Sequence, residues 1–331
     1  MNRSSACITI IIPVYNVDLY LPRCLKSLQA QTFSAYECIL VNDGSTDRSG
    51  LICDEYAKQD DRFTVIHCSN GGPSSARNIG LEHVKTKWVT FIDADDYVTP
   101  DFIKNFFKYN DGDIFTQVIQ GYHCIGYDQT PFDTLYPDTR YLYNVVSEGC
   151  RSTYIEDNNV LYNWAVWCKI FSIDVIRKNR IYFEKTLMCG EDGLFWHTYL
   201  CYVKKIIFIP EQGYIYFCPR QFNSVSRGSK VRMSTEQWLI LANDYKSISN
   251  QLIDKFRIGS HYAVFLQMLY VNNYFKVLMK APTLTTEQFL LLKNIRPSKG
   301  YFIPTLKGVI YWILNLFPIK VSRFIYKVLH R

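Results

Sequence analysis

Short apolar runs alternate with helical patterns through the first hundred residues, and this alternation restricts the fold more than any other feature. The runs, rich in Ile, Val and Phe, occupy residues 8–14, 36–41, 63–67 and 88–92. They begin about 26 residues apart, which suits βαβ units. Between two of them, Leu21, Leu25 and Leu28 follow the i, i+4, i+7 repeat of a helix. Since crossovers between parallel strands are right-handed, we predict an α/β fold with a parallel sheet.

The rest of the chain is less regular. Short aromatic strands are predicted at 113–122 and 205–217, with helices near 146–156 and 191–202. The pattern turns helical between residues 235 and 294. We therefore expect a βαβ half, a mixed half of the same domain, and a helical C-terminal region with a basic tail. Their expected ranges are 1–110, 111–235 and 236–331.

The excess positive charge lies at the end of the sequence. Lys and Arg number 37 against 30 Asp and Glu, a net charge of +7. Residues 296–331 contain seven of the basic residues and no acidic one, so the remaining residues are balanced. A nucleic-acid-binding protein usually spreads its basic residues over a folded face. The distribution argues against nucleic acid as a partner.

The eleven cysteines are scattered and form no CxxC pair. This spacing gives no support to a zinc site or to thioredoxin-type chemistry. Their number is odd, and the first residues lack the charged and apolar regions of a signal peptide. We therefore expect free thiols and a cytoplasmic location.

Polar residues and glycines follow all four of the strands predicted in the first hundred residues. The four segments are Tyr15-Asn16, Asn42–Asp47, Asn70–Asn78 and Asp93–Asp96. In open parallel sheets, ligands bind outside the carboxyl ends of the strands. Four successive strand ends of this composition indicate a ligand site.

The last of these segments holds a cluster of acids. Backbone alternation points Asp93 and Asp95 in the same direction. Neighbouring carboxylates raise one another's pKa unless a cation neutralises them. Oxygen ligands favour Mg²⁺ or Mn²⁺, which complete their coordination with waters and substrate phosphates. A turn that caps the following helix is the alternative interpretation.

Two other segments suit a nucleoside or an anion. Asp43 lies in a tight Asn-Asp-Gly-Ser turn, where its carboxylate can accept hydrogen bonds from a nucleobase imide or a ribose hydroxyl. Gly71 and Gly72 allow the backbone to approach a ligand closely. Arg77 follows in the first turn of a predicted helix, where the helix dipole favours anions. The alternative interpretations are an ordinary turn at Asp43 and a surface ion pair at Arg77.

Together these motifs resemble the family 2 glycosyltransferases of the bacterial surface-polysaccharide type, which have the GT-A fold. The similarity is nearly continuous from residue 7 to about 105 and carries on in shorter segments. Those segments are Trp167–Phe171, Gly190–Asp192, Tyr214–Tyr216 and Asn223–Ser226. The resemblance implies a Rossmann-like nucleotide-sugar-binding sheet, a mixed acceptor region and a helical C-terminal tail. Residues 1–110 would bind the donor, and 111–235 would hold the acceptor and the catalytic base.

The resemblance also implies a nucleotide-sugar donor, usually a UDP-sugar, and a divalent cation, Mn²⁺ or Mg²⁺. Asp95 would be the main ligand of the cation, with Asp93 beside it, and Asp96 would orient the loop. The residues implied on the donor side are Pro13, Tyr15, Asp43, Arg77 and Asp93.

Asp192 matches the catalytic base of that family. An inverting transfer needs one carboxylate to remove the proton of the acceptor hydroxyl. Glu191 and Asp192 stand at the start of a predicted helix, so N-capping is the alternative role. Glu191, Trp164 and Trp167 are placed on the acceptor side, and core packing is the alternative for the tryptophans.

The sequence thus predicts an inverting, metal-dependent glycosyltransferase. A nucleotidyltransferase is one rival, but it needs a Gly-rich basic loop after the first strand, and Pro13–Asn16 is not such a loop. A non-catalytic module that binds nucleotide sugars or glycans is another. That module is expected to have lost its metal ligand or its base, whereas Asp95 and Asp192 are both present.

The last residues predict a basic amphipathic helix. Five apolar residues after Pro318 follow helical spacing, and basic residues lie on the opposite face. The apolar ones are Val321, Phe324, Ile325, Val328 and Leu329, and the basic ones Lys320, Arg323, Lys327 and Arg331. We expect a peripheral location on the inner face of the cell membrane and a glycan or lipid-linked acceptor. A helix docked on protein is the alternative.

Removal of residues 319–331 is expected to release the protein from anionic liposomes. Each basic residue near an anionic surface contributes about 1 kcal/mol of binding, and salt weakens this contribution. Flotation of full-length and truncated protein at low and high salt measures the effect. If the full-length protein ignores anionic liposomes at low salt, the docked-helix alternative holds.

Overall fold

A computed structural model describes residues 6–126, 144–149, 165–218, 233–256, 267, 269–271, 273–277 and 285–294. The chain divides into two compact units. The first comprises 1–148, 158–185 and 191–228, and the second 149–157, 186–190 and 229–331. The predicted tail helix and Trp164 lie outside the described residues.

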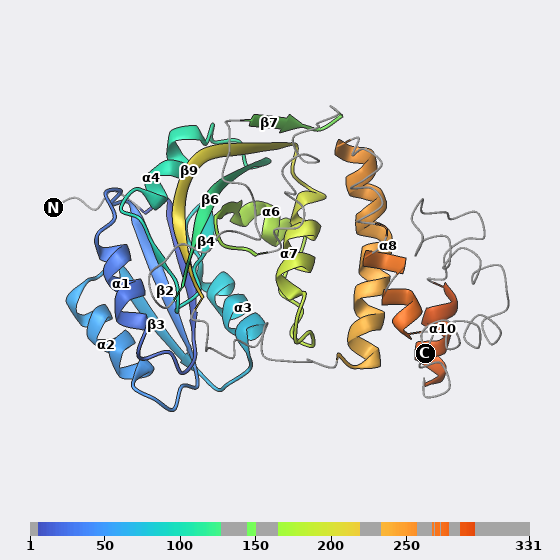
Figure 1. Cartoon of the computed structure of the whole chain (residues 1–331), viewed down its shortest axis with the longest axis horizontal. Coiled ribbons are helices and arrows are strands. Elements are labelled where there is room, and N and C mark those ends of the chain that lie inside the picture. The colour runs from blue at the N-terminus through green and yellow to red at the C-terminus, as the bar shows by residue number, and fades with distance from the viewer. Residues whose placement is uncertain are drawn as a thin grey trace. The chain divides into compact units, whose positions relative to one another are not determined.

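The predicted parallel strands form one side of the sheet in the first unit (Figure 1). Strands β1, β2, β3 and β4 are all parallel, in the order β3-β2-β1-β4. Their bounds are Ile8–Val14, Tyr36–Asp43, Phe63–Cys68 and Trp88–Phe91. Every residue of β4 and all but Pro13 of β1 are buried, as expected for strands with helices on both faces. The βαβ prediction for this half is confirmed.

The other side of the sheet is mixed. Strand β8 pairs antiparallel with both β4 and β6, and β6 runs parallel to β9. Strands β5 and β7 pair antiparallel with β9. The bounds are β5 Tyr97–Val98, β6 Thr116–Gly126, β7 Asn144–Ser147, β8 Lys169–Ser172 and β9 Lys205–Cys218.

The helix predicted near 146–156 is wrong at its start. Val146 lies in β7 opposite Ile206 of β9 and is buried. Its β-branched side chain suits a strand, and pairing with β9 outweighs the local helical spacing. Residues 150–156 lie outside the described residues.

Helices cover both faces of the sheet. In Figure 1, α1, α2 and α4 lie on one face, and α3, α6 and α7 on the other. Their bounds are α1 Leu21–Gln29, α2 Ser49–Gln59, α3 Pro73–His83, α4 Phe102–Tyr109, α6 Ile173–Lys178 and α7 Glu191–Leu200. Phe195 of α7 stacks on Phe183 at 4.1 Å between ring centroids and meets Phe91 of β4 edge-on. The sequence around the candidate base is therefore anchored to the core of the sheet.

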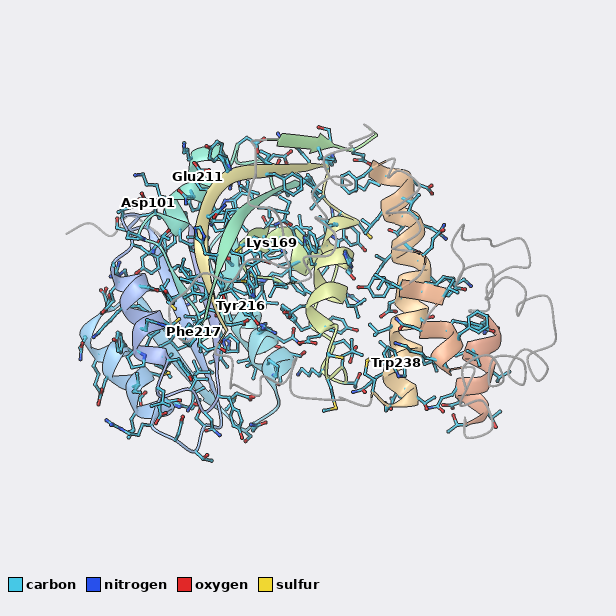
Figure 2. The ribbon with its side chains drawn as sticks, in the orientation of Figure 1. Asp101, Lys169, Glu211, Tyr216, Phe217 and Trp238 are labelled. Atoms are coloured by element: carbon cyan, nitrogen blue, oxygen red, sulfur yellow. The ribbon has the colours of Figure 1, made fainter. Side chains whose placement is uncertain are left out.

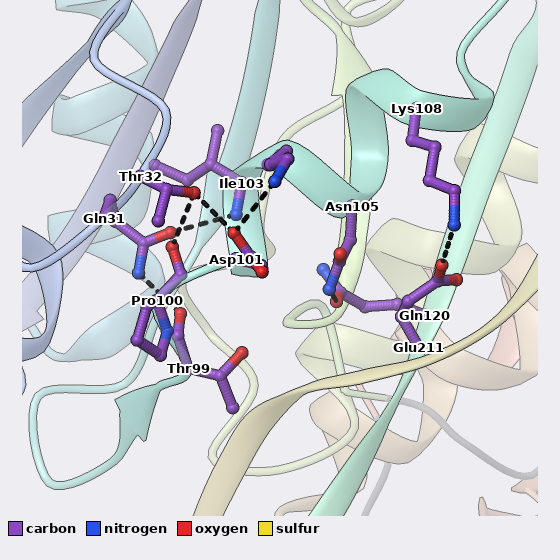
Figure 3. A network of polar contacts seen from close by, with 11 residues as sticks. Gln31, Thr32, Thr99, Pro100, Asp101, Ile103, Asn105, Lys108, Gln120 and Glu211 are labelled. Carbon is purple, nitrogen blue, oxygen red and sulfur yellow. Dashed lines mark hydrogen bonds and ion pairs between the residues drawn. The ribbon is translucent and has the colours of Figure 1, made fainter.

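A polar network ties the end of α1 to the start of α4 (Figure 3). The Gln31 amide donates to the carbonyl of Thr99 at 2.7 Å and accepts from the amide of Ile103 at 3.1 Å. The Thr32 hydroxyl donates to Asp101 at 2.5 Å. These bonds fix residues 99–103, which directly follow β5. They therefore restrain the chain just after the acidic segment Asp93–Asp96 and β5.

The second unit is helical where it is described. It contains α8 (Thr235–Phe256) and α10 (Thr286–Asn294), in agreement with the predicted pattern. Across the described part of the chain, no helix is both long and apolar enough to cross a bilayer. The nine cysteines from Cys7 to Cys201 whose side chains the structure describes carry free thiols.

Candidate functional site

The order of the strands creates a topological switch point between β1 and β4. The chain moves outward from β1 to β2 and β3, then returns to place β4 on the opposite side of β1. At such a switch point the loops after the two strands diverge, and ligands bind there. The loops after β1 and β4 contain Tyr15 and the acids from Asp93 to Asp96.

The loops after β1 and β2 are joined to each other. The side-chain oxygen of Asn16 accepts from the amide of Thr46 at 2.8 Å, and the amide of Asn16 donates to the Ser45 hydroxyl at 3.2 Å. Asn16 has a φ of 50°, which asparagine tolerates better than most residues. Tyr15 remains 47% exposed beside this joint, so its ring is open to a ligand.

Asp43 orders the glycine loop. Its two carboxylate oxygens accept from the amides of Gly71 and Gly72, each at 2.8 Å, and the residue is 2% exposed. Gly72 has a φ of 83°, a conformation in which a side chain would be strained. Asp43 therefore does more than complete its own turn, because it fixes the loop that leads into α3.

Arg77 links the two halves of the site. One of its terminal nitrogens donates to Asp93 at 2.8 Å and the other to Asp192 at 3.0 Å. Its side chain is 5% exposed, so the surface ion pair considered as an alternative is wrong. Burial lowers the pKa of Arg77, but Asp192 and Asp93 together hold it above its ordinary value. The guanidinium is thus permanently charged between two carboxylates.

Asp96 fastens the acidic loop to β9. Its fully buried carboxylate accepts from the Tyr214 hydroxyl at 2.5 Å and from the amide of Phe217 at 2.8 Å. The Tyr214 hydroxyl in turn accepts from the amide of Asp93 at 3.2 Å. The beginning and end of the acidic segment are therefore held by one strand.

The carboxylate of Asp95 accepts a hydrogen bond from its own backbone amide, and no ion pair joins it to another described residue. Burial and the nearby charge of Asp93 raise its pKa to about 6, and Arg23 opposes this rise. Within the described ranges, no three His, Cys, Asp or Glu side chains form a group that could hold a metal ion. Mg²⁺ is commonly bound by one or two carboxylates plus substrate phosphates. Asp93 and Asp95 therefore fit a cation that binds together with a diphosphate.

Asp192 lies in the first turn of α7, and its side chain is 23% exposed. Because the helix begins at Glu191, Asp192 is inside it and the N-cap alternative is wrong. Burial, with help from Glu191 and Asp93, raises the pKa of Asp192 to about 7, against the lowering effects of Arg77 and Lys169. A carboxyl group with a pKa near neutrality suits general-base chemistry.

Neither Trp167 nor Trp196 offers its ring as a sugar-binding face, because both side chains are buried. Trp167 is 7% exposed and stacks on Tyr214 at 4.6 Å between ring centroids. Trp196 is fully buried, and the ammonium of Lys169, which is labelled in Figure 2, lies 4.4 Å from the centroid of its ring. The expectation that Trp167 contacts the acceptor is thus corrected, because packing against β9 covers its ring.

Sequence reasoning missed Arg23 of α1. Its terminal nitrogen donates to the carbonyl of Asp95 at 2.8 Å. One signal was available, because Arg23 lies in the first turn of a predicted helix, where the helix dipole disfavours a cation. A basic residue at such a position indicates a partner elsewhere in the fold.

The fold with this switch point is that of the GT-A glycosyltransferases. A crystal structure of Staphylococcus aureus TarS residues 1–349 in complex with UDP-GlcNAc has a TM-score of 0.66 and 18% identity, over 96% of this chain and 88% of that chain. Residues 9–167 match the family described as Glycosyl transferase family 2. Glycosyltransferase GlyG of Streptococcus pneumoniae is 30% identical over 224 residues, 64% of this chain and 71% of GlyG. The chain belongs to the family 2 glycosyltransferases.

In two other relatives, the region that aligns with this chain is only part of the protein. Glycosyltransferase GlyA of S. pneumoniae is 30% identical over 273 residues, which is 80% of this chain but 37% of GlyA. The uncharacterized glycosyltransferase EpsJ of Bacillus subtilis is 30% identical over 210 residues, 63% of this chain and 60% of EpsJ. The chain therefore spans less than two thirds of either relative.

Asp43→Asn is expected to lower the free energy of unfolding by about 1–3 kcal/mol. The amide nitrogen of asparagine would face a backbone N–H, so one of the two charge-assisted bonds to the glycine loop is lost. Urea unfolding followed by tryptophan fluorescence measures the change. Asp174→Asn, at an exposed carboxylate of α6, is the control and is expected to stay within about 0.5 kcal/mol. Equal unfolding midpoints for the two variants would show that Asp43 does not order the loop.

Proposed function

We propose that the protein is an inverting glycosyltransferase that moves a sugar from a UDP-sugar to an acceptor hydroxyl. The observation that carries this proposal is the pair of Arg77 bonds, which brings Asp93 on the donor side and Asp192 on the base side to one guanidinium. The crystal complex of TarS with UDP-GlcNAc supports the choice of a UDP-sugar, because that protein shares the fold. Pro13, Tyr15 and Asp43 would then surround the nucleoside.

In the proposed reaction, Asp192 removes the proton of the acceptor hydroxyl as the oxygen attacks the anomeric carbon. Arg77 occupies one carboxylate oxygen of Asp192, which orients the group and leaves its other oxygen for the acceptor. The nucleoside diphosphate departs from the opposite face of the sugar, so a single displacement inverts the anomeric configuration. Asp93 and Asp95 would hold Mn²⁺ or Mg²⁺, which when bound supplies positive charge to the diphosphate.

We further propose that the acceptor is a glycan, carried on a lipid or a surface polymer at the inner face of the membrane. The basic amphipathic pattern of the last residues supports this location. A relative also points to a polymeric acceptor: the S. aureus protein named poly(ribitol-phosphate) beta-N-acetylglucosaminyltransferase TarS is 25% identical over 224 residues.

Asp192→Asn is expected to lower turnover by about 10²- to 10⁴-fold while leaving UDP affinity nearly unchanged. The amide keeps the shape of the side chain but cannot take up the proton. Turnover is measured as UDP release from UDP-GlcNAc and UDP-glucose with Mn²⁺, over a panel of glycan acceptors, and affinity by calorimetry.

Asp174→Asn is the matched control for this variant. Asp174 is also an acid in the first turn of a helix, α6, but it is exposed and has no hydrogen bond or ion pair with the described residues of the site. If the Asp192→Asn variant turned over at the parental rate, another residue would have to be the base. Lack of UDP binding by the parental protein in the presence of Mn²⁺ would reject the proposed donor.

The pH dependence of kcat/KM is expected to follow the ionisation of Asp192. The base acts only when ionised, and its pKa is raised to about 7, so activity should fall as the pH drops below neutrality. Arg77→Met removes the charge that lowers this pKa, so the acidic limb should move to higher pH. Profiles from about pH 5.5 to about pH 8.5 test both points, and a flat parental profile would contradict the assignment.

A further inference from the structure

Arg23 reaches from α1 to the acidic segment after β4. Its guanidinium carbon lies 4.0 Å from the ring centroid of Phe217 and 4.4 Å from that of Tyr97. One terminal nitrogen donates to the backbone carbonyl of Asp95 at 2.8 Å. Phe217 lies near the end of β9 (Figure 2), so this single side chain contacts α1, β5, β9 and the acidic segment.

The placement of Arg23 is costly for the protein. The residue is third in α1, where the positive end of the helix dipole repels a cation. Its Nε atom is also buried without a hydrogen-bond partner. Two aromatic faces offset part of this cost, because a planar guanidinium stacks on rings in a way that an ammonium does not. Such a costly arrangement indicates that the position of the guanidinium matters.

The three acids of the segment are held in different ways. The Asp93 carboxylate bonds to Arg77, and that of Asp96 bonds to Tyr214 and Phe217. The carboxylate of Asp95 accepts a hydrogen bond from its own backbone amide, so the backbone of this residue fixes its direction. The bond from Arg23 to the carbonyl of Asp95 supplies this restraint.

We infer that Arg23 is a positioning residue, which aims the Asp95 carboxylate at the divalent cation by fixing the backbone of Asp95. The inference rests on the proposed function, because it takes Asp95 as a ligand of a cation bound with UDP. Arg23 itself contacts neither the cation nor the reacting atoms in this scheme. Its effect passes through the peptide unit between Asp95 and Asp96.

Arg23→Met is expected to weaken Mn²⁺ binding in the presence of saturating UDP by about 10- to 100-fold, the usual effect of losing a partner that orients a metal ligand. The concentration of free Mn²⁺, read by electron paramagnetic resonance, gives the dissociation constant without any turnover. Arg23→Lys keeps the charge but loses the planar stack, so an intermediate loss is expected. The lysine variant also serves if the methionine variant fails to fold.

Arg62→Met is the matched control. Arg62 also lies over an aromatic ring, that of Tyr36 at 4.7 Å. It pairs with Asp60 just before β3 begins, whereas the acidic segment lies after β4 ends. Its Mn²⁺ affinity is expected to equal that of the parental protein. Equal losses in the Arg23 and Arg62 variants would show a general packing effect and overturn the inference, as would parental affinity in both Arg23 variants.

Amide hydrogen exchange without metal or UDP separates this inference from the proposed function. The amides of Asp93 and Asp96 are expected to exchange faster in the Arg23 variants and at the parental rate in Arg62→Met, because of these two arginines only Arg23 bonds to the segment. Unchanged exchange in the Arg23 variants would overturn the inference. If the parental protein binds no Mn²⁺ with UDP, the proposed cation site fails and the role of Arg23 in metal binding fails with it, whatever the exchange shows.

Discussion

The site depends on one buried guanidinium. Arg77 carries a single positive charge between Asp93 and Asp192, and its own burial means that neither bond is a weak surface pair. Removing a charge from water costs several kcal/mol, and a buried ion repays this only with well-placed partners. Either carboxylate alone would leave one end of the guanidinium unbonded. The acidic segment after β4 and the first turn of α7 are therefore bound to each other through this one side chain.

The sheet supplies the frame for this contact. Asp93 follows β4, Arg77 belongs to α3, and Asp192 belongs to α7, which packs on the same face through Phe195. On the opposite side of the segment, Asp96 and Tyr214 join it to β9. The acidic loop is thus restrained by the parallel half and by the mixed half of the sheet together.

Periodicity was sufficient to predict the parallel half of the fold, because each strand and helix there has its own local pattern and the loops follow at the strand ends. The partners of Arg77 were beyond such reasoning, since nothing local selects Asp93 and Asp192 from 30 acidic residues. The predictions of an acceptor contact for Trp167 and of a helix at Val146 were wrong for a related reason. Their places in the core and in β7 are set by β9, which lies far away in the sequence.

Strand β8 is the only strand in the described part of the chain that pairs with both β4 and β6, and it does so through two residue pairs on each side. Pairing through so few residues limits how far a change of backbone register can pass along the sheet from one half to the other. Substitutions or insertions in β6 can therefore alter the mixed half while the parallel strands keep their register. Such an architecture allows one half of the scaffold to vary in evolution while the strand ends of the other half are retained.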